Sequence, residues 1–198
     1  MNLSTTIRML FNALTKPEQH ILIGDIPAGH ILDIGGGGEG VIAQAGGTRV
    51  TPIDKFMSEI HEAREKAMNA HWMTADATQL PCKNDSFDAA TMFFSAMYMP
   101  SDVKEKVFKE THRVLKTSGE LWIWDVNMRQ ERQVFAIRLQ VKFNDTLKIK
   151  TIYGVKAKDQ SAASICDMLL QTGFEPKVVT QNKHWFLIKA QKQEHIAQ

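Results

Sequence analysis

The chain has 198 residues, enough for one domain with a substantial hydrophobic core, and its composition of 43% hydrophobic and 23% charged residues is that of an ordinary globular protein. Its formal net charge of +2 gives no strong attraction to nucleic acid or to a membrane, so neither is an expected partner. The two cysteines, Cys82 and Cys166, are far apart, which argues against a disulfide framework or a metal site and favours a reducing cytoplasm.

The N-terminal segment, residues 1–16, is predicted to form an amphipathic helix. Ile7, Leu10, Phe11 and Leu14 recur there at helical spacing. The apolar run is too short for a signal peptide or a membrane span, so we expect neither.

Residues 29–127 alternate apolar runs of strand length with helical patterns. The expected strands are 29–35, 48–54, 70–77, the first part of 87–99, and 119–127. The expected helices are 41–45, a helix from Lys55 with Ile60, Ala63, Ala67 and Met68 on its apolar face, and one from Ser101 to Leu115. Strands and helices in this order indicate a parallel sheet with helices on both faces.

The pattern changes after Asn127. Residues 132–155 alternate with period two around Asn144, which predicts a β-hairpin. A helix at 161–172, ended by Gly173, follows. Two antiparallel strands are expected within 177–190, so a parallel α/β half precedes an antiparallel tail.

A glycine-rich loop follows the first of the parallel strands, in HILDIGGGGEG (residues 30–40). Gly35, Gly37 and Gly40 match the G-x-G-x-x-G spacing of dinucleotide-binding loops, which place a pyrophosphate at a helix N-terminus. Asp33 precedes the loop, and acidic residues also end the next two strands. These acids favour S-adenosylmethionine, which carries a sulfonium, an ammonium and a ribose diol but no phosphate. A nicotinamide-dependent oxidoreductase stays the alternative.

Four ordered motifs resemble those of class I S-adenosylmethionine-dependent methyltransferases: LDIGGGGEG, TPID, TADATQLPCKNDSFDAATMFF and HRVLKTSGELWIWD. The resemblance covers roughly residues 30–127. It implies a doubly wound, mostly parallel, seven-stranded Rossmann-like sheet with an antiparallel C-terminal ending, in a single domain of residues 1–198. In one departure from the pattern, the third glycine comes one residue late, at Gly40, with Glu39 in its place.

The resemblance further implies S-adenosyl-L-methionine as the cofactor. Asp33 would hold its ammonium, Asp54 the ribose hydroxyls, and Asp76 with the backbone N–H of Ala77 the adenine. As alternatives, Asp33 and Asp54 cap the turns or helices that follow them, and Asp76 is a solvated loop acid. The expected cofactor-binding residues are Asp33, Gly35, Gly37, Asp54, Lys55, Asp76, Ala77 and Phe94.

The methyl acceptor is expected to be a small molecule, accepting at O, N, S or C. Methyl transfer from a sulfonium needs alignment, and needs a base only where the acceptor carries a proton. Tyr98, His112 and Asp125 are the candidate bases at the strand ends, although no motif supports any of them.

The segment 1–16 and the hairpin within 130–155 are expected to form a substrate lid. Residues 128–198 hold twelve Lys and Arg against six Asp and Glu, so an anionic acceptor is a further hypothesis, with Lys142, Lys148 and Lys150 as its contacts. We expect a monomer or homodimer. Besides the oxidoreductase, a non-catalytic protein that only binds S-adenosylmethionine is a rival interpretation.

Overall fold

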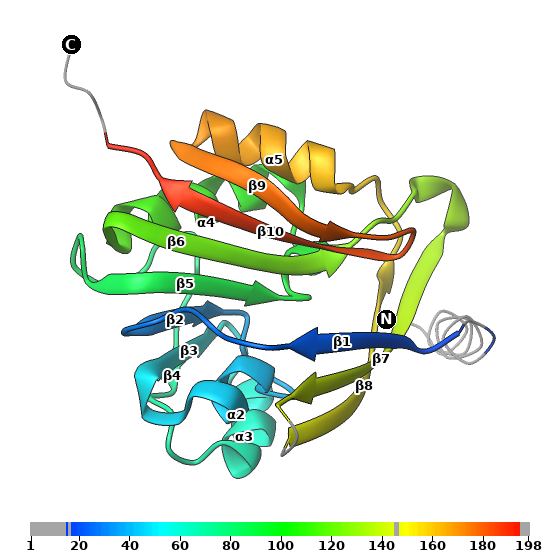
Figure 1. The fold of residues 1–198 in the computed structure, drawn as a ribbon, viewed down its shortest axis with the longest axis horizontal. Coiled ribbons are helices and arrows are strands. Elements are labelled where there is room, and N and C mark those ends of the chain that lie inside the picture. Colours follow the sequence, from blue (N-terminus) through cyan, green and yellow to red (C-terminus); the bar gives the residue numbers. More distant parts are fainter. Residues whose placement is uncertain (1–14, 16, 145–146, 195–198) are drawn as a thin grey trace.

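The computed structural model describes residues 15, 17–144 and 147–194, and its centre is a seven-stranded sheet in the order β4-β3-β2-β5-β6-β10-β9 (Figure 1). The strands are β2 (Ile31–Ile34), β3 (Val50–Asp54), β4 (Met73–Thr74), β5 (Phe87–Phe93), β6 (Leu115–Val126), β9 (Phe174–Gln181) and β10 (Trp185–Lys192). Strands β2 to β6 pair in parallel, and β10 runs antiparallel to β6 and β9. This order confirms the predicted fold class. The chain reverses its direction of strand addition between β2 and β5, where doubly wound sheets bind ligands.

Helices cover one face of this sheet. The apolar sides of α4 (Ser101–Val114) and α5 (Ala162–Gln171) pack there, in a cluster that includes Phe108, Leu169 and Phe186. Figure 1 shows both helices above the central strands. The predicted helix extended one residue too far, to Leu115, whereas α4 ends at Val114 and Leu115 is the first residue of β6.

Two shorter helices, α2 (Val41–Gly46) and α3 (Met57–Lys66), follow β2 and β3. Ile60 and Ala63 form the buried side of α3. The prediction was wrong for Met68, whose side chain is 78% exposed, because α3 ends before the turn that would bring it inward.

The other face of the central sheet meets a second sheet of three strands, β1 (Gln19–Ile23), β7 (Val134–Phe143) and β8 (Leu147–Lys156). The β7–β8 pair is the predicted hairpin. Strand β1 was not predicted, and it pairs in parallel with β7. Ile21 and Leu139 from this sheet share an apolar cluster with Trp124 of β6. Helix α2 lies on this face as well, through Val41, Ile42 and Ala43 of the same cluster, so both faces carry helices as expected. The additional three-stranded sheet on this face was not predicted.

The predicted helix of residues 1–16 lies, except for Thr15, outside the described residues. Among the helices that the structure describes, none has the length and apolar character needed to cross a bilayer.

Candidate functional site

A cavity of about 830 Å³ lies at the carboxyl ends of the parallel strands. The glycine-rich loop after β2 forms one side, and the loops after β3 and β4 form another. The loop after β5, part of α4 and strand β8 complete the lining. The cavity is thus built at the strand-order reversal and is partly covered by the hairpin, which Figure 1 shows beside the carboxyl ends of the central strands.

The glycine-rich loop is anchored to the elements around it. The backbone N–H of Gly35 donates to the carbonyl of Ile53 at 2.9 Å, and that of Gly38 to the carbonyl of Glu59 at 2.9 Å. A Cβ atom at Gly37 would lie 2.5 Å from the Cβ of Glu59 and 2.8 Å from a carboxylate oxygen of Asp54. Only glycine permits this approach, so the loop backbone itself forms the cavity wall.

The late third glycine has a structural role of its own. Gly40 is the N-cap of α2 with φ 58°, a left-handed conformation that favours glycine. A Cβ atom there would lie 3.2 Å from Trp72 and 3.3 Å from Ala63. Glu39 turns its carboxylate to Lys66, at 3.1 Å. The loop therefore accommodates Glu39 through an ion pair with α3 and reaches the helix one residue later.

Asp33 lies beneath the glycine-rich loop rather than on the cavity wall. It is 1% exposed, and the Thr91 hydroxyl donates to it at 2.7 Å. A Cβ atom at Gly36 would come 2.5 Å from its other oxygen. Burial raises the pKa of Asp33 to about 7, so its charge is poorly compensated within the described protein.

Asp54 and Asp76 lie on the cavity wall at the ends of neighbouring strands. Asp54 accepts a hydrogen bond from the Phe56 N–H at 2.9 Å, which caps the turn before α3. The alternative that it caps a helix beginning at Lys55 was wrong, because α3 begins at Met57 and has no side-chain cap. Asp76 accepts from the backbone and hydroxyl of Thr78 at 2.9 and 2.7 Å and pairs with Lys55 at 3.1 Å. The hydrogen bonds from Thr78, with the Lys55 ammonium, lower the pKa of Asp76 to about 2, which keeps it ionised. Gly35, Gly37, Lys55 and Ala77 line the same cavity.

Phe94 and Tyr98 line the cavity from the loop after β5, which contains the 3₁₀ turn Ala96–Tyr98. Phe94 is buried and has φ 53°, an uncommon value for a residue with a Cβ. Sequence reasoning missed Tyr153 of β8, whose ring stacks on Phe94 with centroids 5.4 Å apart and planes 2° apart. The period-two pattern of the hairpin could have indicated the position of Tyr153, because side chains two residues apart share one strand face. Ile149, Thr151 and Tyr153 lie on the same face for this reason.

Asp125 does not reach the cavity. It is fully buried, accepts from the Met97 N–H at 3.1 Å, and accepts from the Gln160 amide at 2.7 Å. The buried Lys104 donates to Gln160 at 2.6 Å. Burial raises the pKa of Asp125 to about 6 and lowers that of Lys104 to about 8. This network holds the loop after β5 from below, and Asp125 cannot contact a ligand in the cavity.

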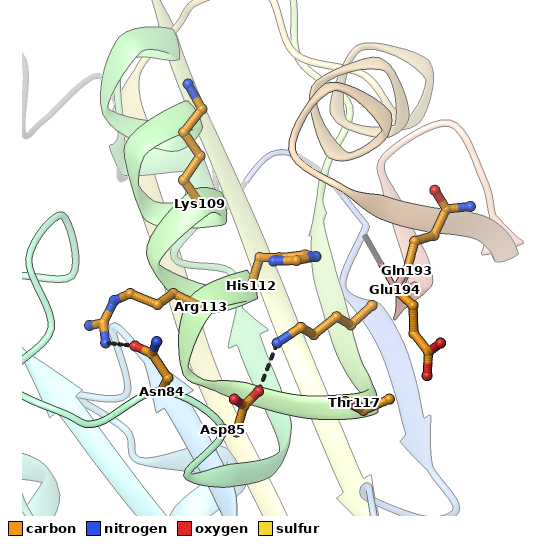
Figure 2. Close-up of a pocket in the computed structure, with 9 residues that line it drawn as sticks. Asn84, Asp85, Lys109, His112, Arg113, Thr117, Gln193 and Glu194 are labelled. Carbon is orange, nitrogen blue, oxygen red and sulfur yellow. Dashed lines mark hydrogen bonds and ion pairs between the residues drawn. The ribbon is translucent and has the colours of Figure 1, made fainter. Parts of the chain in front are cut away.

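His112 belongs to a different part of the molecule. Figure 2 shows it on α4, in a second cavity of about 560 Å³ that it lines with Arg113 and Glu194. Its ring packs edge-on against Phe174, with centroids 5.3 Å apart. Three cations of this cavity pair with neighbouring carboxylates: Lys192 with Asp85 at 3.0 Å, Arg113 with Glu110 at 2.7 Å and Lys109 with Glu105 at 2.6 Å. The structure does not bring His112 to the cofactor side.

Comparison with known proteins agrees with this geometry. A family model described as "Methyltransferase domain" matches residues 31–119. A sterol 4-C-methyltransferase of Caenorhabditis elegans is 31% identical over 105 residues, which cover 49% of this chain and 31% of that protein. A ubiquinone/menaquinone biosynthesis C-methyltransferase of Paracoccus denitrificans is 28% identical over 170 residues, which cover 73% of this chain and 66% of that protein. The chain therefore spans less than two thirds of either relative.

Among solved structures, a protein of Methanosarcina mazei described as an S-adenosylmethionine-dependent methyltransferase is similar in fold. Its TM-score is 0.61 at 21% identity, and the match covers 86% of this chain and 99% of that one.

Proposed function

We propose that the chain is a class I S-adenosylmethionine-dependent methyltransferase, which binds S-adenosylmethionine in the 830 Å³ cavity and transfers the methyl group to a small-molecule acceptor. The observation that carries the proposal is the pair of carboxylates, Asp54 and Asp76, on adjacent strand ends facing a side-chain-free glycine loop.

The charges of the cavity support a cationic ligand. Five acidic residues and two lysines line it. The acidic residues are Glu39, Asp54, Glu59, Glu62 and Asp76. A sulfonium and an ammonium gain from these carboxylates, whereas a dinucleotide pyrophosphate would be repelled by them. This charge balance argues against the nicotinamide-dependent alternative.

Three carboxylates, those of Asp54, Asp76 and Asp33, have a proposed part in holding the ligand. Asp54 accepts hydrogen bonds from the ribose hydroxyls, and Asp76 with the Ala77 N–H holds the adenine edge. Asp33 acts from beneath the loop, where its charge attracts the ammonium through the backbone of Gly36. Phe94 packs beside the adenosyl group, and Lys55 positions Asp76 through their ion pair.

S-adenosylmethionine supplies an electrophilic methyl group. When it is bound, its carbon–sulfur electron pair would leave with the sulfur, so the leaving group would need no acid, and the proton of a carbon acceptor would be lost to water. The protein's task is alignment of the reacting atoms, which contributes roughly 7–11 kcal/mol in favourable cases. Tyr98 is the one of the three candidate bases that lines the cavity. Burial by its neighbours raises its pKa to about 12, so it acts as a hydrogen-bond donor and not as a base at neutral pH.

The acceptor atom is proposed to be carbon, because both relatives described above are C-methyltransferases. The hairpin is proposed as the lid over the acceptor side, and residues 1–16 keep that predicted role. We further propose that the protein is cytoplasmic, that it is a monomer or homodimer, and that it has no nucleic-acid partner.

Thermal unfolding with S-adenosylmethionine, S-adenosylhomocysteine, NAD and NADP in parallel tests the cofactor. A ligand at one hundred times its Kd adds about 2.7 kcal/mol to the free energy of unfolding. For a chain of this size the melting temperature then rises by roughly 5–10 °C. We expect that rise with the two adenosyl compounds alone. No rise with them would refute the proposal.

A further inference from the structure

The chain contains two tyrosines, and both line the cavity. Tyr98 comes from the loop after β5, and Tyr153 comes from β8 of the hairpin. Tyr153 and Phe94 lie in parallel, offset planes, as their 5.4 Å centroid separation and 2° angle show. On the side of the cavity between the β5 loop and the hairpin, the two rings therefore form one aromatic stack, in which Phe94 is buried and Tyr153 is the partly exposed ring.

The two phenol groups stay protonated, because burial raises the pKa of Tyr98 to about 12 and that of Tyr153 well above its usual range. The backbone of Gly154 acts on the Tyr98 phenol, and the side chain of Thr151 acts on the Tyr153 phenol, to lower these pKa values in part. The protonated Tyr98 hydroxyl therefore has a proton to donate to a ligand.

The backbone beside Tyr98 is also fixed from below. Asp125 accepts from the Met97 N–H at 3.1 Å, and the Lys158 ammonium donates to the Met99 carbonyl at 2.8 Å. These contacts bracket Tyr98 on both sides in the sequence. A ring and a hydroxyl that are held this firmly suit recognition of one ligand shape.

The elements on this side of the cavity bring no charged side chain to it. The end of β5, the loop after it and β8 contribute nine lining residues, and all are uncharged: Phe93, Phe94, Ser95, Tyr98, Met99, Pro100, Thr151, Ile152 and Tyr153. The hairpin lysines Lys142, Lys148 and Lys150 are exposed and are not among the lining residues. The charged lining residues that act on the two phenols are carboxylates, Glu59 on Tyr98 and Glu39 on Tyr153. The hypothesis of an anionic acceptor thus finds no counter-charge here, and an anionic ligand would lose hydration without compensation.

We propose that the space between the β5 loop and β8 is the acceptor subsite, and that it selects an uncharged, flat ring compound bearing a hydroxyl or carbonyl oxygen. Tyr153, which stacks on the buried Phe94, contacts the ring, and Tyr98 donates to the oxygen. Tyr98 and Ile152, which are 47% and 44% exposed, form its apolar entrance. This inference rests on the proposed function, because the ring would approach the methyl group from this side.

The presence of only two tyrosines allows a direct test by NMR. In protein labelled with ring-¹³C tyrosine, Tyr98→Phe and Tyr153→Phe assign the two sets of signals. We would saturate the protein with S-adenosylhomocysteine, confirm its binding by calorimetry, and titrate 2-naphthol, with 2-naphthoate and cyclohexanol as matched probes. We expect saturable shifts of both tyrosines with 2-naphthol and affinities for the other two at least about 10-fold weaker, since the charge or the flat ring is then wrong.

The outcomes separate the inference from the proposed function. If S-adenosylhomocysteine binds but 2-naphthol moves neither tyrosine, or 2-naphthoate binds equally well, the acceptor-subsite proposal is overturned while the cofactor proposal stands. If S-adenosylhomocysteine does not bind at all, the proposed function falls, and the ring-binding subsite still stands or falls on the naphthol titration.

Substitutions at Tyr153 test its specificity role. Tyr153→Leu removes the flat ring and is expected to weaken 2-naphthol binding by about 10-fold, whereas Tyr153→Phe keeps the ring and changes it by about 3-fold or less. The unchanged signal of Tyr98 in both variants reports that the cavity remains folded. Equal 2-naphthol affinity for wild type and Tyr153→Leu would contradict the proposed role.

Discussion

Asp33→Asn isolates the effect of one buried charge. Asparagine has the size of aspartate and still accepts the hydrogen bond of Thr91, which is 2.7 Å long in the wild type. Burial raises the pKa of Asp33 from 3.8 to about 7, so the unfolded chain loses this proton first as pH rises. The contribution of Asp33 to the free energy of unfolding is therefore fully present below about pH 4, and it is lost progressively as the pH rises through about 7.

The size of the effect follows from the shift. A rise of about three pH units corresponds to about 4 kcal/mol of unfolding free energy, because each unit is worth about 1.4 kcal/mol. About 1.5 kcal/mol of this has been lost by pH 5, and all of it by pH 8. Asp33→Asn avoids the loss. The free energy of unfolding of the variant, relative to that of the wild type, should therefore rise by about 2.5 kcal/mol between pH 5 and pH 8. This corresponds to roughly 5–10 °C in melting temperature.

Thermal unfolding of both proteins at pH 5 and pH 8, without ligand, measures this difference. Asp125 also titrates in this range, since burial raises its pKa to about 6, but it is present in both proteins and cancels. A melting-temperature difference that is the same at both pH values would refute the conclusion that Asp33 is a buried acid with little compensation.

Three further substitutions test other contacts. Asp54→Ala should weaken S-adenosylhomocysteine binding about 10- to 100-fold by calorimetry, since hydrogen bonds to a charged group are lost, while the exposed control Asp167→Ala should not. Lys104→Met leaves a buried amide oxygen unpaired and should lower stability to urea by about 1–3 kcal/mol; no loss would contradict the 2.6 Å contact. Gly40→Ala, at φ 58°, should destabilise by about 1–2 kcal/mol, whereas Gly24→Ala, with open space around it, should cost little.

The central sheet was predictable because its signals are local. Strands β2 and β5 are apolar on almost every position, and glycine, acidic or helix-starting residues follow each strand. Parallel strands place their carboxyl ends at one edge, so Asp54 and Asp76 had to lie near each other once the strand order was assumed.

The second sheet was not predictable in the same way. Gln19 of β1 lies opposite Leu139 of β7, and no periodicity within either segment indicates so distant a partner. The orientation of side chains at strand ends is equally hidden. Asp125 and Tyr98 looked equivalent as candidate bases, yet one is fully buried under Met97 and the other is 47% exposed at the cavity entrance. Tertiary packing decides such cases.

A crystal structure of the complex with S-adenosylhomocysteine tests the central claim most directly. We expect the ribose hydroxyls within about 3 Å of the Asp54 carboxylate, the adenine beside Asp76 and Ala77, and the homocysteine end over the glycine-rich loop. An adenosyl group bound anywhere else, or one in the cavity without contact to Asp54, would contradict the cofactor site described here.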